Sequence, residues 1–131
     1  MQMSSQLSFT IDEPDGIVHV VGVGMWSPEY VVEHFRDLDR ALERIRREQG
    51  FARVFVDLRA AAVQATQTTQ VLGEWTGRVY RDSDRAAVLC ASALLAMQIK
   101  RAADVRLLAT FHEMAPALAW LRQDATGRLS A

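Results

Sequence analysis

The sequence predicts one α/β domain with a mixed, mostly parallel sheet, an N-terminal β-hairpin and flanking helices. Runs of β-branched residues alternate with amphipathic helical stretches, which is typical of parallel strands joined by right-handed crossovers. The chain has 131 residues, of which 50% are hydrophobic and 24% are charged, as expected for one globular domain. We therefore expect a single domain over residues 1–131, with its core between about residues 7 and 122 and the order β-β-α-β-α-β-α-β-α.

The first two predicted strands form an antiparallel hairpin. Leu7 to Ile11 alternates apolar and polar residues, Glu13-Pro14-Asp15-Gly16 suits a tight turn, and Ile17 to Val23 is rich in β-branched residues. Ser27 can then cap a helix that begins at Pro28 and runs to Gly50. An apolar stripe on this helix is expected to face the core: Val31, Phe35, Leu38, Leu42 and Ile45.

The next strand and helix are central to the predicted fold. Arg53 to Leu58 is an apolar run without alternation, as expected for a strand covered on both faces. Gly73 and Gly77 lie inside the following helix, where each costs about 1 kcal/mol relative to alanine. Close packing explains these glycines most simply, and the alternative is a loose helix that moves over a site. The helix is predicted over Gln64 to Arg81, with an inward stripe of Leu72, Trp75 and Val79.

Two strands and two helices complete the prediction. Ala86 to Ala91 and Val105 to Phe111 are predicted as strands. Ala93 to Ala103 is predicted as a helix with Leu95, Ile99 and Ala102 inward. A final helix begins around Pro116 and carries Leu118 and Leu121 on its inner face.

Charge, cysteine content and hydropathy exclude several classes of protein. The formal net charge is -1 and basic residues alternate with acids, so we expect no nucleic-acid partner. Cys90 is the only cysteine, which excludes an intramolecular disulfide and suits a reducing cytoplasm. The opening residues lack a secretory signal, and Ala86 to Met97 is shorter than the roughly 20 apolar residues of a membrane-spanning helix. We therefore expect a cytoplasmic protein that is not an integral membrane protein.

Two segments resemble a known superfamily. VFVDLRAAAVQATQ resembles the strand-to-helix junction of STAS domains, the sulfate-transporter and anti-sigma-antagonist superfamily. FHEMAPALAWL resembles the close of the STAS/Sec14-like branch, whose members are similar to the sporulation anti-sigma-factor antagonists. The element order agrees from about Leu7 to Arg122. The resemblance implies a STAS/Sec14-like, SpoIIAA-like fold. It also implies either regulation of a protein partner or, on the Sec14 side, a bound small molecule.

A phosphorylated hydroxyl is a further expectation of the resemblance. The classical antagonists carry an Asp-Ser-Ser-Gly type motif at the start of the second helix, and its phosphorylation releases a partner kinase. The corresponding stretch here, Ala65-Thr66-Gln67-Thr68, has no acidic residue or glycine, so the match is partial. Thr66 and Thr68 are the nearest equivalents, near a helix N-terminus that tolerates negative charge. Capping and surface positions explain these threonines more simply.

The carboxyl ends of the parallel strands are the expected ligand site of an open α/β sheet. Trp26 follows a strand and Trp75 lies on the second helix. Together with Tyr30 and Tyr80 they could line an apolar groove, although core packing is the default use of large aromatic residues. Arg59 could orient an anionic head in such a groove. The candidate ligand-binding residues are Trp26, Arg59, Thr66, Trp75, Ser92 and His112.

Catalytic and cofactor chemistry find weaker support. Ser92, His112 and Asp57 supply the residue types of a hydrolase, but Cys90-Ala91-Ser92-Ala93-Leu94 lacks the glycines of a nucleophile elbow. Gly22-Val23-Gly24 lacks the third glycine of a dinucleotide fingerprint and is better explained as easing a strand out of the sheet. His19, His34 and His112 have no ligand spacing, so we predict no metal. Cys90 is expected to be buried and unreactive.

The sequence therefore predicts a non-catalytic binding module without a cofactor. The first hypothesis is a small apolar or anionic ligand held between the second helix and the sheet, which requires a cavity there. The alternative is a regulatory protein-protein interaction module, which requires an apolar patch on the second-helix surface. A weak hydrolase is the third hypothesis and requires Ser92 and His112 within hydrogen-bonding reach. Spare apolar surface on a small domain is also compatible with a homodimer.

Overall fold

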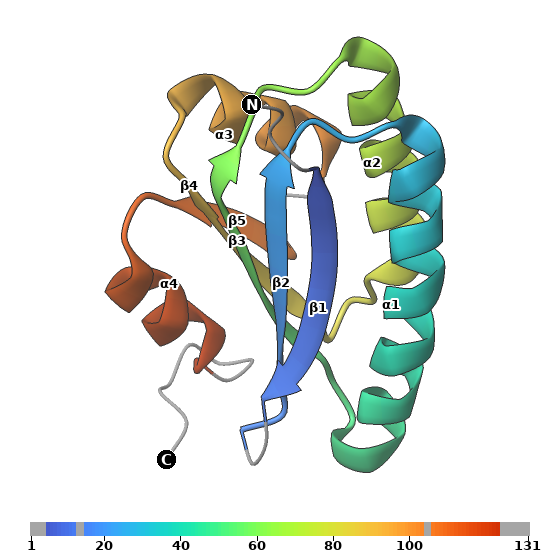
Figure 1. The fold of residues 1–131 in the computed structure, drawn as a ribbon. Helices are drawn as coiled ribbons and strands as arrows, with labels where there is room; N and C mark the ends of the chain where they lie inside the picture. Colours follow the sequence, from blue (N-terminus) through green and yellow to red (C-terminus); the bar gives the residue numbers. More distant parts are fainter. Residues whose placement is uncertain (1–4, 13–14, 104–105, 124–131) are drawn as a thin grey trace.

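Five strands form one sheet in the order β1-β2-β3-β4-β5 (Figure 1). The structure is a computed structural model and describes residues 5–12, 15–103 and 106–123. β1 pairs antiparallel with β2, and each later pair is parallel, which confirms the predicted hairpin and mostly parallel sheet. Glu13 and Pro14 of the predicted turn lie outside the described residues. The strands are β1 (Gln6–Asp12), β2 (Ile17–Gly24), β3 (Arg53–Ala61), β4 (Arg85–Cys90) and β5 (Leu108–Phe111).

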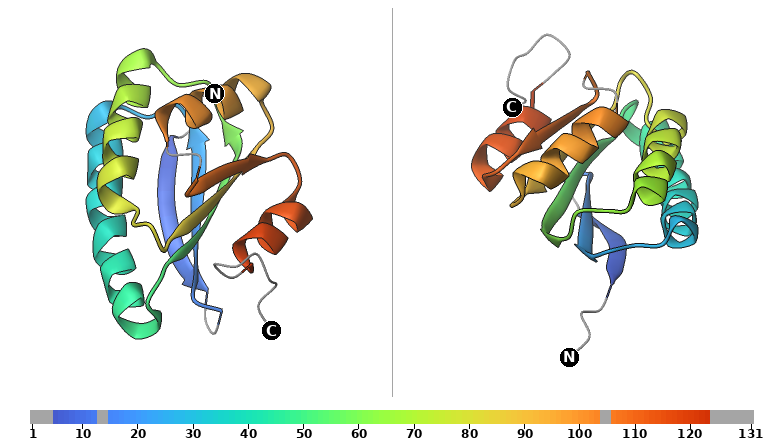
Figure 2. Two further views of the ribbon diagram at one scale, coloured as in Figure 1. Left: turned by 180° about the vertical axis from the view of Figure 1, so that it is seen from behind. Right: turned by 90° about the horizontal axis from the view of Figure 1, so that it is seen from above.

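Helices cover the two faces of the sheet unequally. α1 (Pro28–Gln49), α2 (Thr66–Val79) and α3 (Ala93–Ala102) share one large core with the sheet (Figure 2). α4 (Met114–Leu121) packs on the opposite face, against β3, β4 and β5. The outer face of β2 is left partly open, and Val21 there is 40% exposed. No described helix is long and apolar enough to span a membrane.

α1 begins and ends where its sequence predicts. The Ser27 hydroxyl accepts a hydrogen bond from the Tyr30 amide at 3.1 Å, and Pro28 occupies the first turn. Gly50 ends the helix with φ at 87°, a left-handed conformation that glycine adopts at little cost. All five residues of the predicted stripe are buried, and His34 is buried beside them.

The amino-terminal edge of the parallel strands is fixed by one buried carboxylate. Asp84 is 1% exposed and accepts hydrogen bonds from the Arg46 guanidinium and from the Ala52 and Arg81 amides. These contacts join the last turn of α1, the approach to β3 and the segment between α2 and β4. A buried charge with this many partners is satisfied, and loss of either charged partner would leave the other uncompensated.

Three predictions about element bounds and cover are wrong in part. α2 spans Thr66–Val79 instead of Gln64 to Arg81, and the buried Gln64 side chain hydrogen-bonds Gly24 and Trp26 at the end of β2 and Ala62 in its own loop. β5 begins at Leu108 instead of Val105, and Val105 lies outside the described residues. β3 is covered on both faces only at its start, since α4 buries Phe55 while Asp57 stays partly exposed.

The two glycines of α2 have different surroundings. A Cβ atom added at Gly73 would lie 2.9 Å from the backbone oxygen of Ala102, so glycine there permits close packing of α2 on α3. A Cβ atom added at Gly77 would meet no atom within 4 Å. The close-packing explanation therefore holds for Gly73. Gly77 has no packing reason and simply weakens the second half of the helix.

We expect opposite effects from replacing these two glycines. Gly77→Ala should stabilise the fold by about 0.5–1 kcal/mol through helix propensity. Gly73→Ala should destabilise it by about 1–3 kcal/mol, because α2 and α3 must separate. Urea unfolding of both variants measures the two changes. A stabilising Gly73→Ala would contradict the proposed close packing of α2 on α3.

Candidate functional site

The candidate site lies at the carboxyl-terminal edge of the parallel strands, where one buried glutamine joins the loops. The Gln64 side-chain oxygen accepts a hydrogen bond from the Trp26 amide at 3.0 Å, and its nitrogen donates to the oxygens of Gly24 and Ala62 at 3.0 and 2.7 Å. The Gln64 backbone pairs in both directions with the Gln98 side chain, at 2.9 and 2.8 Å. These bonds connect the β2–α1 loop, the β3–α2 loop and α3 into one frame.

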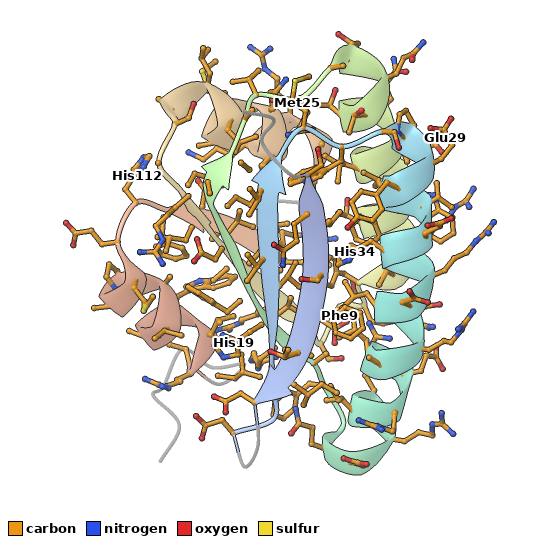
Figure 3. The ribbon with its side chains drawn as sticks, in the orientation of Figure 1. Phe9, His19, Met25, Glu29, His34 and His112 are labelled. Atoms are coloured by element: carbon orange, nitrogen blue, oxygen red, sulfur yellow. The ribbon has the colours of Figure 1, made fainter. Side chains whose placement is uncertain are left out.

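Large apolar side chains project from this frame into solvent. Met25 is 52% exposed and lies just beyond the carboxyl end of β2, in the loop that leads to α1 (Figure 3). Val63 adjoins Gln64 in the β3–α2 loop, and Leu94 and Met97 lie one turn and one residue before Gln98 on α3. Their exposed fractions are 41%, 64% and 47%. We call these four residues the carboxyl-edge patch: Met25, Val63, Leu94 and Met97.

Trp26 is a structural residue beneath this patch. It is 4% exposed, and its indole nitrogen donates to the backbone oxygens of Gln6 and Val23 at 2.8 and 3.1 Å. A Cβ atom at Gly22 would lie 2.6 Å from the indole and 2.5 Å from Leu58, so glycine there leaves room for the ring. Gly24 has φ at 72° where the chain leaves β2. Gly22 therefore leaves room for the Trp26 ring, and Gly24 provides the left-handed backbone conformation where the chain leaves β2.

Arg59 forms an ion pair with Asp57 instead of facing the helices. Its Nε and Nη2 atoms lie 3.0 and 2.8 Å from the two carboxylate oxygens, and its side chain is 53% exposed. The hydrogen bond from Arg59 holds the pKa of Asp57 below its usual value. Arg59 is therefore exposed to solvent and paired within its own strand.

The two candidate ligand-binding residues of α2, Thr66 and Trp75, lie in different surroundings. Thr66 is exposed at the first turn and lines an open, mostly polar groove between α2 and α3. Thr68 is 1% exposed and donates to the Trp26 oxygen at 2.9 Å, so its hydroxyl is not accessible. Trp75 packs at the rim of the core, with the guanidinium carbons of Arg78 and Arg36 at 5.1 and 5.9 Å from its ring.

Ser92 and His112 have separate hydrogen-bond partners. The Ser92 hydroxyl caps α3 by accepting from the Leu95 amide at 3.2 Å. His112 is exposed, and its Nδ1 atom lies 2.9 Å from the Cys90 oxygen. Within the described residues, no hydrogen bond joins Ser92 to His112.

A cavity of about 60 Å³ lies between the sheet and the three helices that share its large core. Trp26 contributes to its walls, as does Leu72 of the predicted inward stripe of α2, but Arg59, Thr66, Trp75, Ser92 and His112 do not. Its few polar side chains are His34, Thr76 and Tyr80. The position between α2 and the sheet is the one that the ligand hypothesis requires, whereas the volume is far below the roughly 300–1,000 Å³ of typical ligand pockets.

Sequence reasoning missed the residues that hold the edge and line the cavity. His34 lies three residues after Val31 and four before Leu38, so its spacing alone places it on the buried stripe. Gln64 gives no such signal, because a polar residue next to a predicted helix start is usually exposed. Tyr80, by contrast, is one of the aromatic residues that the sequence predicts for an apolar groove, and it lines the cavity.

Chemically reactive groups are few among the described residues. No group of three or more His, Cys, Asp or Glu side chains there could hold a metal ion. Cys90 is buried, as predicted, and burial raises the pKa of its thiol to about 11. The thiol is therefore protonated near neutral pH and a poor nucleophile.

Solved structures share the fold of this chain. One is a protein of the DUF3478 family with a SpoIIAA-like fold from Shewanella loihica, at 16% identity, 92% coverage of this chain, 96% coverage of that chain and a TM-score of 0.54. Another is an anti-sigma factor antagonist from Mycobacterium paratuberculosis, at 12% identity, 90% and 96% coverage and a TM-score of 0.56. Scans of family models and of curated proteins find no match. The expected SpoIIAA-like, STAS-type fold is confirmed.

Burial of His34 predicts a loss of stability in mild acid. Desolvation lowers its pKa from 6.5 to about 4, against a smaller opposing effect of Asp37. Between these values the unfolded chain binds more protons, so stability rises with pH and falls as pH drops. From pH 7 to pH 5 the wild type should lose about 2 kcal/mol more than His34→Phe, which keeps a ring beside Phe9 and Phe35. Equal losses in urea unfolding at the two pH values would show that His34 is not buried as a neutral ring.

Proposed function

We propose that this SpoIIAA-like domain is a non-catalytic binding module that docks a protein partner through the carboxyl-edge patch. The observation that carries the proposal is the exposure of four large apolar side chains on the two loops and the helix that Gln64 and Gln98 join. Apolar side chains scattered singly over a surface need no explanation, but a group of them marks an interaction site. Methionine and leucine are also adaptable contact residues.

The frame beneath the patch supports a docking role. The Gln64 side chain makes three hydrogen bonds to the two adjoining loops, and Thr68 adds a fourth to the Trp26 oxygen. Loops held in this way lose little conformational entropy when a partner binds. The patch is therefore preorganised, and more of its contact energy remains available as affinity.

The position of the patch revises the expected partner surface. The exposed side chains of α2 are mainly polar, as at Gln67, Gln70 and Glu74, so the helix itself offers no apolar patch. The adjoining β3–α2 loop does, at Val63. Similarity in fold to an anti-sigma factor antagonist supports a regulatory role for the domain.

Holding a sizeable ligand under α2 is the weaker candidate for the main function. The cavity there encloses about 60 Å³ and no cation lines it. Arg59, the residue expected to orient an anionic head, is paired with Asp57 outside the cavity. The cavity therefore lacks the volume for a lipid-sized ligand and the cation for an anionic ligand.

Replacing one valine of the patch should weaken partner binding strongly. The tagged protein is used as bait in a lysate of its source organism, and affinity for the recovered partner is then measured by calorimetry with purified components. Val63→Lys places a charge in the interface, and we expect it to weaken binding by about 30-fold or more. Leu94→Lys should act in the same direction.

Val21→Lys is the matched control for this experiment. Val21 and Val63 have exposed fractions of 40% and 41%, but Val21 lies on the open outer face of β2. We expect its substitution to change the affinity by less than about threefold. Equal losses in the two variants, or no partner that the wild type recovers reproducibly, would contradict docking at the carboxyl-edge patch.

A further inference from the structure

A second hollow adjoins the cavity beneath α2. It has a volume of about 140 Å³ and shares four wall residues with the cavity: Thr76, Tyr80, Ala103 and Leu108. Gly77 and Asp82 also line this hollow, at the end of α2 and in the segment that leads to β4. The hollow therefore lies against the same side chains as the cavity, beside the carboxyl end of α2 and far along the helix from its start at Thr66.

Two polar side chains on these walls have no hydrogen-bond partner among the described residues. His34 is 6% exposed and lies between α1 and β1 (Figure 3), where its ring contacts Phe9 and Phe35 and forms no hydrogen bond with a described residue. The Tyr80 hydroxyl likewise forms no hydrogen bond with a described residue, whereas the Thr76 hydroxyl donates to the Gly73 oxygen at 3.1 Å. Arg46 Nη1 is the one fully enclosed side-chain N or O atom without a partner among the described residues, so the polar atoms of His34 and Tyr80 are not completely enclosed and can pair with a molecule in the adjoining space.

Both unpaired side chains are uncharged near neutral pH. Desolvation lowers the pKa of His34 to about 4, so the ring is a neutral imidazole with one donor and one acceptor. Burial, with the nearby Asp84 carboxylate, raises the pKa of Tyr80 above its usual value, so the phenol keeps its proton. No lysine or arginine lines the cavity or the hollow, and the one charged wall residue is Asp82 at the outer side.

Water could pair with His34 and Tyr80 but would leave the rest of the wall without a matching partner. An ordered buried water needs two to four polar partners. Apolar side chains such as Leu72, Val88 and Ile99 form most of the cavity wall, and Thr76 already uses its hydroxyl proton. A hydrocarbon group satisfies such walls better than water does.

We infer that the cavity and its adjoining hollow form a binding site for a small uncharged molecule with a short hydrocarbon chain and a hydroxyl or carbonyl group. The volumes of about 60 and 140 Å³ suit a ligand of a few heavy atoms. The hydrogen-bonding group of the ligand lies at Tyr80, which lines both spaces. A carboxylate is excluded, because it would lose its hydration without gaining a cation and would approach Asp82. The inference does not rest on the proposed docking function.

The test uses 1-butanol and butyrate as matched probes in methyl NMR titrations of the full chain. We expect 1-butanol to shift the methyl signals of Leu72 and Val88 in a saturable way, and butyrate to bind at least tenfold more weakly. Tyr80→Phe should weaken 1-butanol binding by about three- to tenfold, through loss of one hydrogen bond. Val63→Lys, which tests docking, should leave 1-butanol binding unchanged.

A matched pair of variants locates the probe. Val88 is 2% exposed and lines the cavity, so Val88→Ile adds a methylene group to the enclosed space and should lower the affinity for 1-butanol. Val21→Ile makes the same change on the open face of β2 and should have no effect. Shifts that do not saturate, that persist unchanged in Val88→Ile, or that butyrate produces equally well would overturn the inference.

Discussion

The buried side-chain amide of Gln64 is the interaction on which the carboxyl-terminal edge depends. It accepts a hydrogen bond from the Trp26 amide and donates to the oxygens of Gly24 and Ala62, of which the Gly24 oxygen also accepts from the Ala62 amide. An unpaired buried amide or carbonyl costs about 1–3 kcal/mol, so loss of this side chain would destabilise the Trp26 amide and the Ala62 oxygen together. The Gln98 side chain then holds the Gln64 backbone against α3. The edge therefore behaves as one unit.

Two buried polar side chains hold the two ends of the parallel strands. Asp84 fixes the amino-terminal edge through Arg46 and two backbone amides, and Gln64 fixes the carboxyl-terminal edge. Between these two ends, α2 is tightly packed at Gly73 and free of neighbours at Gly77. The end of α2 around Gly77 is therefore loosely packed and lies beside the hollow. The start of α2, where Thr68 hydrogen-bonds Trp26, is firmly held and lies on the side of the carboxyl-edge patch. The two proposed sites thus lie at opposite ends of one helix and can be tested separately.

Sequence patterns predict the elements of this fold well because burial follows periodicity. The stripe of α1, the Ser27 cap and the parallel strands all depend on local spacing, which the sequence displays directly. The site is less predictable, since it depends on which polar residues are buried. Arg59 was expected to face a ligand, yet a carboxylate two residues away on its own strand pairs with it. Gln64 is buried only because two loops converge on it, and no local pattern encodes that convergence. His34 is the exception, because its helical spacing places it on the buried stripe.

Gln64 makes the carboxyl-terminal edge a fixed surface. Hydrogen exchange of the Trp26 amide tests this role of Gln64 most directly. This amide lies in a loop, so only its 3.0 Å hydrogen bond to the Gln64 side chain can protect it strongly. NMR-detected exchange in the wild type should show protection of Trp26 comparable to that of the adjoining strands, and Gln64→Ala should remove the protection of Trp26 while β4 stays protected. Exchange of Trp26 at the rate of an unprotected loop amide in the wild type would contradict the account.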